Sequence, residues 1–135
     1  MKFDHMVLKR SASAHLQYAR LKQAFKEFVD AGSAYLARPD PPIAGIKLEV
    51  NLHENYFDVF FVGMHVRFQF LVRKGTDGAM IGAVVVVRKS PTFSNEPDLI
   101  GSFMLTPEGK TEYEDATAAE VVLHWLDEAL EHQMP

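Results

Sequence analysis

Two pairs of polar side chains in the middle of the chain are candidates for acid–base chemistry. One pair is Asp58 with His65, and the other is Glu49 with Arg67. Proton transfer in an enzyme needs two titratable groups that are held at different pKa values in one cavity. The same residues can also form ordinary polar pairs between neighbouring strands, and we favour this simpler interpretation. We therefore expect no catalytic residue.

Metal-binding and phosphate-binding residues do not occur in the patterns that such sites need. The six histidines match no zinc or iron spacing, and His53-Glu54 is not followed by the second histidine of a zinc-protease helix. The chain has no cysteine, which excludes disulfides and thiolate metal sites. Gly101-Ser102-Phe103 lacks the second glycine of a nucleophile elbow, and Gly75–Gly78 lacks the lysine of a phosphate-binding loop. We expect no metal and no cofactor.

Five residues of the central segment are candidates for a binding surface, namely Phe57, Phe61, His65, Arg67 and Arg73. Residues 65, 67 and 73 are all odd-numbered, so in a strand they would line one surface. The two phenylalanines would offer stacking platforms. Together with Lys47, Lys74, Arg88 and Lys89 they would suit nucleic acid, but the sequence pI of about 5.8 argues against that partner.

Charge is distributed unevenly along the chain. Residues 1–90 contain 13 basic and 8 acidic side chains, whereas residues 91–135 contain one basic and 10 acidic side chains. Either the two halves neutralise each other within one fold, or a basic face and an acidic face each meet a partner, including a second copy in a head-to-tail assembly. Charge alone does not choose between them.

Two segments carry the periodicity of amphipathic helices. The first runs from Ser11 or Ser13 to Arg38, with a weak point at residues 30–33 because glycine destabilises a helix interior. Its apolar stripe has 4-3 spacing and consists of Ala14, Tyr18, Leu21, Phe25, Phe28, Gly32 and Tyr35. The second begins at Thr117-Ala118-Ala119-Glu120, which has the pattern of a capping box, and continues to residue 132.

The remaining segments alternate like strands and predict an antiparallel sheet of about five strands. The main expected strands are residues 46–53, 56–73, 80–87 and 99–105, with a short charged segment at 110–114 suited to an edge. Residues 2–9 alternate weakly and form either a short first strand or a disordered lead-in. Residues 56–73 are long for one strand, and Gly63 either bends or splits them. The alternation keeps its phase through Gly63, which favours a single bent strand. We predict one α+β domain, residues 1–135, in the order β-α-β-β-β-β-α, with a helix at each end flanking the sheet.

The middle strands are apolar on both faces, which raises the question of what covers them. Phe57, Val59 and Phe61 add a second apolar face beside Phe60, and residues 81–87 do the same for their strand. Three arrangements satisfy this pattern: one helix on each face, a second chain on one face, or a ligand cavity under a curved sheet.

The order of elements resembles two known arrangements. A short strand, a pair of helices, several antiparallel strands and a C-terminal helix, in that order, are similar to the helix-grip arrangement, which holds lipids and other apolar ligands. The small acidic chain with a long first helix is also similar to secretion chaperones, which work as dimers. Those chaperones place a helix in mid-sheet, where this chain has the Ser90–Asp98 loop.

These observations favour a non-enzymatic binding module that recognises a protein and forms a homodimer. The alternative is a small-molecule cup for an apolar ligand, with simple acid–base activity as an option. The longest apolar run, Ala83–Val87, is far too short to span a membrane. We expect a cytoplasmic protein that has no membrane partner.

Overall fold

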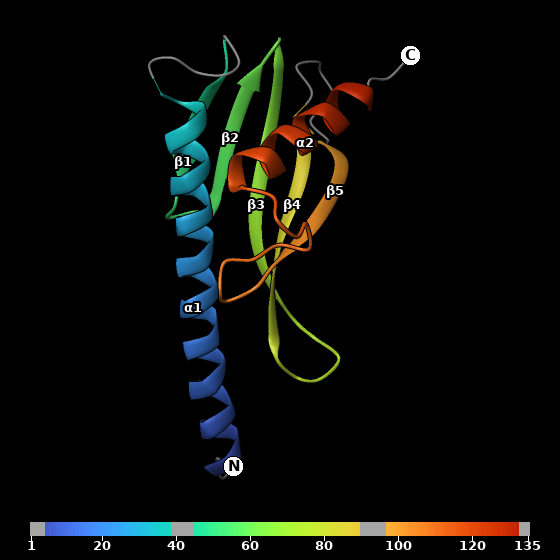
Figure 1. The fold of residues 1–135 in the computed structure, drawn as a ribbon. Coiled ribbons are helices and arrows are strands. Elements are labelled where there is room, and N and C mark those ends of the chain that lie inside the picture. Colours follow the sequence, from blue (N-terminus) through green and yellow to red (C-terminus); the bar gives the residue numbers. More distant parts are fainter. Residues whose placement is uncertain (1–4, 39–44, 90–96, 133–135) are drawn as a thin grey trace.

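The computed structural model describes residues 5–38, 45–89 and 97–132 and shows two helices and one sheet (Figure 1). The elements are α1 His5–Leu36, β1 Lys47–Asn51, β2 Tyr56–Phe61, β3 Met64–Lys74, β4 Met80–Lys89, β5 Asp98–Leu105 and α2 Ala118–Glu131. The five strands pair antiparallel in the order β1-β2-β3-β4-β5. The predicted α+β class with a helix at each end of the sheet is therefore confirmed. Residues 90–96 of the predicted loop lie outside the described residues.

The predicted first strand, residues 2–9, is wrong, so the chain does not begin with a strand. α1 begins at His5 and runs through the segment, and residues 1–4 lie outside the described residues. Residues 6–10 contain no glycine or proline, and Met, Leu, Lys and Arg are good helix formers, so the helix extends beyond the serines expected to cap it. It also continues through residues 30–33, where Gly32 faces Ala118 and Val122 of α2.

The predicted edge strand at residues 110–114 is also wrong. Only an isolated bridge between Leu105 and Thr111 forms there. A side chain replaces the missing backbone pairing, because the Glu112 carboxylate accepts a hydrogen bond of 2.9 Å from the Met104 backbone N–H. The exposed edge of β5 is thus partly closed by a turn and a carboxylate.

Residues 56–73 form two strands joined by a tight turn, so the single bent strand favoured by the alternation is wrong. Val62 and Gly63 have φ values of 45° and 79°, and Phe61 pairs directly with Met64. Two consecutive residues with positive φ are the mark of a type I′ hairpin turn. A two-residue turn places odd residues of β2 and even residues of β3 on the same face, which the unbroken alternation concealed.

Both helices pack on the same face of the sheet, which we call the inner face (Figure 1). Leu21, Phe25 and Phe28 of α1 belong to one buried cluster with inner-face residues such as Phe68. The α2 residues that join the same cluster are Ala119, Val121, Val122, Trp125, Leu126 and Ala129. The arrangement with one helix on each face is therefore wrong, and neither helix covers the other side.

Aromatic rings fill the inner layer. Phe57 stacks on Phe68 with ring centroids 4.6 Å apart, and Phe25 of α1 stacks on Phe70 at 5.0 Å. At the other end of the sheet a Cβ on Gly101 would lie 2.6 Å from the Trp125 ring, so glycine allows α2 to approach β5. The α2 capping box is present, with the Thr117 side chain accepting a hydrogen bond from the Glu120 N–H. The strands predicted at 46–53, 80–87 and 99–105 are confirmed as β1, β4 and β5.

Replacing Val62 by asparagine should raise the free energy of unfolding by about 1 kcal/mol, because asparagine tolerates positive φ and valine does not. Val62 is 65% exposed, so little packing is lost. Urea unfolding measures the difference. Val50→Asn, at another exposed valine but in a strand, should not stabilise the protein. A loss of stability in Val62→Asn would contradict the assigned turn.

Candidate functional site

The outer face of the sheet, opposite the helices, carries the candidate site. We define it from the strand register as the side chains that alternate with the core residues. It consists of Lys47, Glu49 and Asn51 of β1; Tyr56, Asp58 and Phe60 of β2; His65, Arg67, Gln69, Leu71 and Arg73 of β3; Ile81, Ala83, Val85, Val87 and Lys89 of β4; and Leu99, Ser102 and Met104 of β5.

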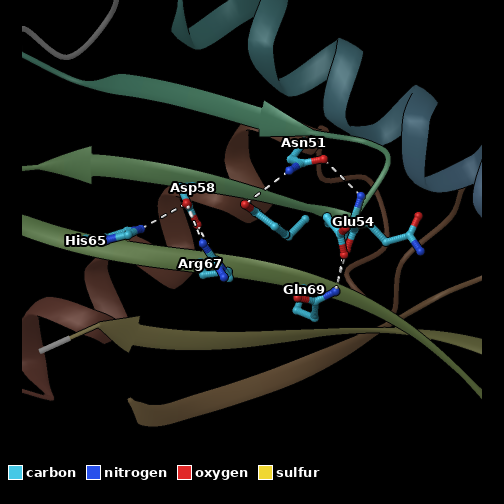
Figure 2. Close-up of polar contacts among 8 residues, drawn as sticks. Asn51, Glu54, Asp58, His65, Arg67 and Gln69 are labelled. Carbon is cyan, nitrogen blue, oxygen red and sulfur yellow. Dashed lines mark hydrogen bonds and ion pairs between the residues drawn. The ribbon is translucent and has the colours of Figure 1, made fainter. Parts of the chain in front are cut away.

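Asp58 is the centre of a polar network on this face. Its carboxylate accepts two hydrogen bonds from Arg67, from Nε to Oδ1 at 2.8 Å and from Nη2 to Oδ2 at 3.0 Å. His65 Nε2 lies 3.1 Å from Oδ2, although its direction does not meet hydrogen-bond geometry. Figure 2 shows His65 and Arg67 on one strand and Asp58 on the next. The carboxylate is buried although it lies on the outer face, because these side chains cover it.

The electrostatics of the network favour the charged forms of both main partners. Burial acts to raise the pKa of Asp58, but the hydrogen bonds and positive charge of Arg67, with a contribution from His65, outweigh it and hold the pKa below its usual value. The hydrogen bonds to Asp58 raise the pKa of Arg67. Arg67 and Asp58 therefore form a permanently charged, mutually neutralised pair at neutral pH.

Aromatic side chains pack around this ion pair. The Arg67 guanidinium carbon lies 3.7 Å from the Tyr56 ring centroid, a cation–π contact. His65 stacks on Phe60 with centroids 4.5 Å apart. Both nitrogens of Arg67 that face Asp58 are occupied, and the rings restrict the remaining approach. The arrangement is built for rigidity rather than for exchanging partners.

A second set of polar contacts fixes the β1–β2 turn beside the network (Figure 2). The backbone N–H of Glu54 donates to Asn51 Oδ1 at 3.0 Å, and Asn51 Nδ2 donates to the Tyr56 hydroxyl at 3.3 Å. Gln69 Nε2 donates to the carbonyl oxygens of Glu54 and Asn55 at 3.1 Å each. These bonds tie the turn to β3 and complete the polar half of the outer face.

Only one of the two candidate acid–base pairs forms in the structure. Asp58 and His65 are brought together, whereas Arg67 binds Asp58 and leaves Glu49 to pair with Lys47 at 3.4 Å. A carboxylate that orients a histidine is one part of a nucleophilic site, which also needs a nucleophile such as serine beside the histidine. The nearest serine on the outer face is Ser102 of β5, two strands beyond β3, so no serine of the described residues lies beside Asp58 and His65 on this face. The described residues also contain no group of three metal-ligating side chains.

The other half of the outer face is apolar. We define the apolar patch as Leu71, Ile81, Ala83, Val85, Val87, Leu99 and Met104, which neighbour one another across β3, β4 and β5. Leu71, Leu99 and Met104 are 45%, 63% and 50% exposed. Ala83 lies between Leu71 and Met104 in the register, so a small side chain separates two large ones. Arg67 pairs with Val87 across β3 and β4 and marks the border with the polar half.

The five sequence-predicted binding residues do not form one surface. His65 and Arg67 lie together, and Arg73 lies at the far end of β3 opposite Ile81. Phe57 is 1% exposed in the core, and Phe61 faces the inner side beside Met64. Arg88 also points inward and donates to the Ala129 carbonyl oxygen at 3.3 Å.

Sequence reasoning missed three members of the patch, namely Leu71, Leu99 and Met104. Leu71 stood out only as the apolar exception in a run of polar odd positions, which is the signal that could have identified it. Met104 gave no signal, because alternation in a short apolar strand does not reveal which face is covered.

Three clefts lie beside α1, and none of them is lined by Asp58, His65 or Arg67. One of about 700 Å³ lies between α1 and the segment 106–118. Its buried lining includes Ala24, Phe28 and Val121, and its exposed lining carries one lysine and four carboxylates, namely Lys110, Glu27, Glu108, Glu114 and Asp115. The inner face of the sheet is filled by the core itself.

No helix in the described ranges combines the length and apolar character needed to cross a bilayer. Comparisons with protein-family models, curated proteins and solved structures found nothing similar to this chain. Function is therefore argued from the geometry.

Replacing Asp58 by asparagine should lower the free energy of unfolding by about 2 kcal/mol at neutral pH, because it removes the charge that Arg67 binds. The folded pKa of Asp58 lies below its unfolded value, so its contribution is present above about pH 4 and is lost as pH falls further. The difference between wild type and variant should thus shrink under acid.

Urea unfolding at a series of pH values measures this difference. Glu49→Gln is the matched control, because that carboxylate is exposed and pairs only with exposed Lys47, and we expect a change of less than about 0.5 kcal/mol. If the difference in the free energy of unfolding between wild type and Asp58→Asn does not change with pH, the network depends on the shape of the Asp58 side chain and not on its charge.

Proposed function

We propose that this protein is a non-enzymatic protein-binding module that self-associates as a homodimer through the apolar patch. The observation that carries the proposal is that both helices cover the inner face and leave the patch open. Contiguous apolar surface on a soluble domain is characteristic of an interaction site. A sheet face that is apolar over three neighbouring strands offers the flat, regular surface that a protein partner can cover.

Pairing of the charges at the centre of the outer face supports a second copy as the partner. A two-fold interface places the same surface on both sides, so unpaired charge within it would meet like charge. Here Asp58 is neutralised by Arg67, and Lys47 pairs with Glu49. The unpaired cations of this face, Arg73 and Lys89, stand at opposite ends of the strands.

The shape of the patch also supports self-association. Ala83 is 5% exposed and leaves a shallow position between Leu71 and Met104, which are both about half exposed. A surface that presents both projecting and recessed side chains can interlock with a copy of itself. The Asp58 network and the turn contacts hold the neighbouring strands rigid, which reduces the entropy lost on association.

The arrangement at Asp58 favours a structural role over an enzymatic one. The carboxylate is occupied by Arg67, His65 stacks on Phe60, and the clefts described above lie elsewhere. Acid–base catalysis would require a substrate to reach the pair within a cavity.

Small-molecule binding is the second candidate, favoured by the cleft between α1 and residues 106–118. Its volume of about 700 Å³ falls in the range typical of ligand sites. Its acidic margin suits an apolar amine better than a neutral lipid. A thermal-shift titration with alkylamines should raise Tm by mass action if this candidate holds, and alkyl carboxylates of equal length should not.

Wild-type protein should have twice the chain mass of 15.2 kDa by size-exclusion chromatography with light scattering. Val85→Lys should weaken the dimer by at least about tenfold, because it buries an unpaired charge in the patch. Val50→Lys, the same change at an exposed valine of β1 outside the patch, should leave the dimer intact.

Circular dichroism checks that each variant is folded. A wild-type monomer at a chain concentration of about 100 μM, well above the micromolar range of a weak interface, would contradict the proposed dimer. Equal weakening by Val50→Lys would move the interface away from the outer face.

A further inference from the structure

The first half of α1 carries an apolar stripe on its solvent side. Leu8, Ala12, Leu16 and Ala19 follow one another at 4-4-3 spacing, which places them on one face of a helix. Leu8 and Leu16 are 56% and 64% exposed, and both alanines are also exposed. The core residues Leu21 and Phe25 continue a different stripe, so this solvent-side stripe is not an extension of the core contact.

The same half of the helix is strongly basic. Residues 5–26 include no aspartate or glutamate and contain five cations, namely Lys9, Arg10, Arg20, Lys22 and Lys26. None of the five forms an ion pair with any other described residue.

Among the described residues, no acidic side chain forms an ion pair with the cations of this end. The ion pairs of the described residues all lie on β1, β2 and β3, and none joins residues before 90 to residues after 97. Figure 1 shows the first half of α1 running past α2, toward the end where β3 and β4 meet in a turn. This part of the helix is therefore accessible along its solvent side.

We propose that this stripe docks an acidic amphipathic helix of another protein. Leu8 and Leu16 provide two apolar anchors, and Ala12 and Ala19 allow a second helix to approach closely. Lys9 and Arg20 lie beside the stripe, where acidic residues of the partner would pair with them. The surface is separate from the apolar patch, so the inference does not depend on the proposed homodimer.

Charge and shape argue against a second copy of the chain, nucleic acid or a membrane as the partner of this stripe. A second copy of α1 would set these cations against like charge. The exposed face of α2 offers Glu120, Asp127, Glu128 and Glu131 but no exposed large apolar side chain, since the apolar residues of α2 are buried in the core or packed against it. Nucleic acid would leave the two leucines facing phosphates, and two leucines give a membrane little to bind.

The test is fluorescence anisotropy with a labelled, amidated peptide of about 20 residues, long enough to form a helix. The peptide carries leucines at 4-4-3 spacing and glutamates on the flanking positions. A matched peptide has lysine at every glutamate. Wild-type protein should bind the acidic peptide, and the lysine peptide should bind at least about tenfold more weakly.

Leu16→Glu should weaken binding of the acidic peptide by about tenfold or more, because it removes an anchor and adds like charge. Val62→Glu is the matched control, because Val62 is as exposed as Leu16 and lies in the β2–β3 turn outside both the stripe and the apolar patch, and it should leave binding unchanged. Both positions are exposed, so both variants should fold, which circular dichroism confirms.

Three results would overturn the proposal. The acidic peptide fails to bind, or Leu16→Glu and Val62→Glu bind it equally well, or a DNA duplex or phosphatidylserine vesicles bind wild type more tightly than the peptide does and are insensitive to Leu16→Glu. The last result would identify a general polyanion surface in place of a helix-docking site.

Discussion

The one-sided packing of two helices against the sheet is the constraint on which the rest of the structure depends. Phe25 and Phe28 of α1 and Trp125 of α2 enter the same inner layer of aromatic rings as Phe57 and Phe103. Burial of such side chains contributes about 1.5–3 kcal/mol each, which commits both helices to this face. The outer face is then left to its own side chains, which include two neutralising ion pairs and the open apolar patch.

Local signals in the sequence predicted many of the elements. Strict alternation identified β1, and the capping box at Thr117 identified the start of α2, because both patterns depend on neighbouring residues only. The 4-3 stripe identified the buried face of α1 through Leu21, Phe25 and Phe28. The sequence also showed that the middle strands are apolar on both faces, which raised the question of what covers the face away from the helices.

The sequence-based predictions that were wrong failed because of contacts between distant residues or because one side chain replaced an expected backbone pairing. Val62 hid the hairpin turn, because a β-branched residue is unexpected at positive φ and the alternation continued across it. The segment around Thr111 looked like a strand, but the Glu112 side chain took over the edge pairing. Which helix lies on which face cannot be derived from periodicity, since an amphipathic helix fits either side of a sheet. Of the candidate pairs, only Asp58 with His65 formed, as register decides which strands meet.

The most direct test of the central claim, that the outer face is an interface between two copies, is an isotope-filtered NOE experiment. The sample mixes chains with labelled methyl groups and unlabelled chains. We expect intermolecular NOEs to the methyl groups of Leu71, Val85 and Met104, and none to the core methyl groups of Val59 or Val121. Intermolecular NOEs confined to α1 or α2, with the outer-face methyl groups silent, would contradict the account.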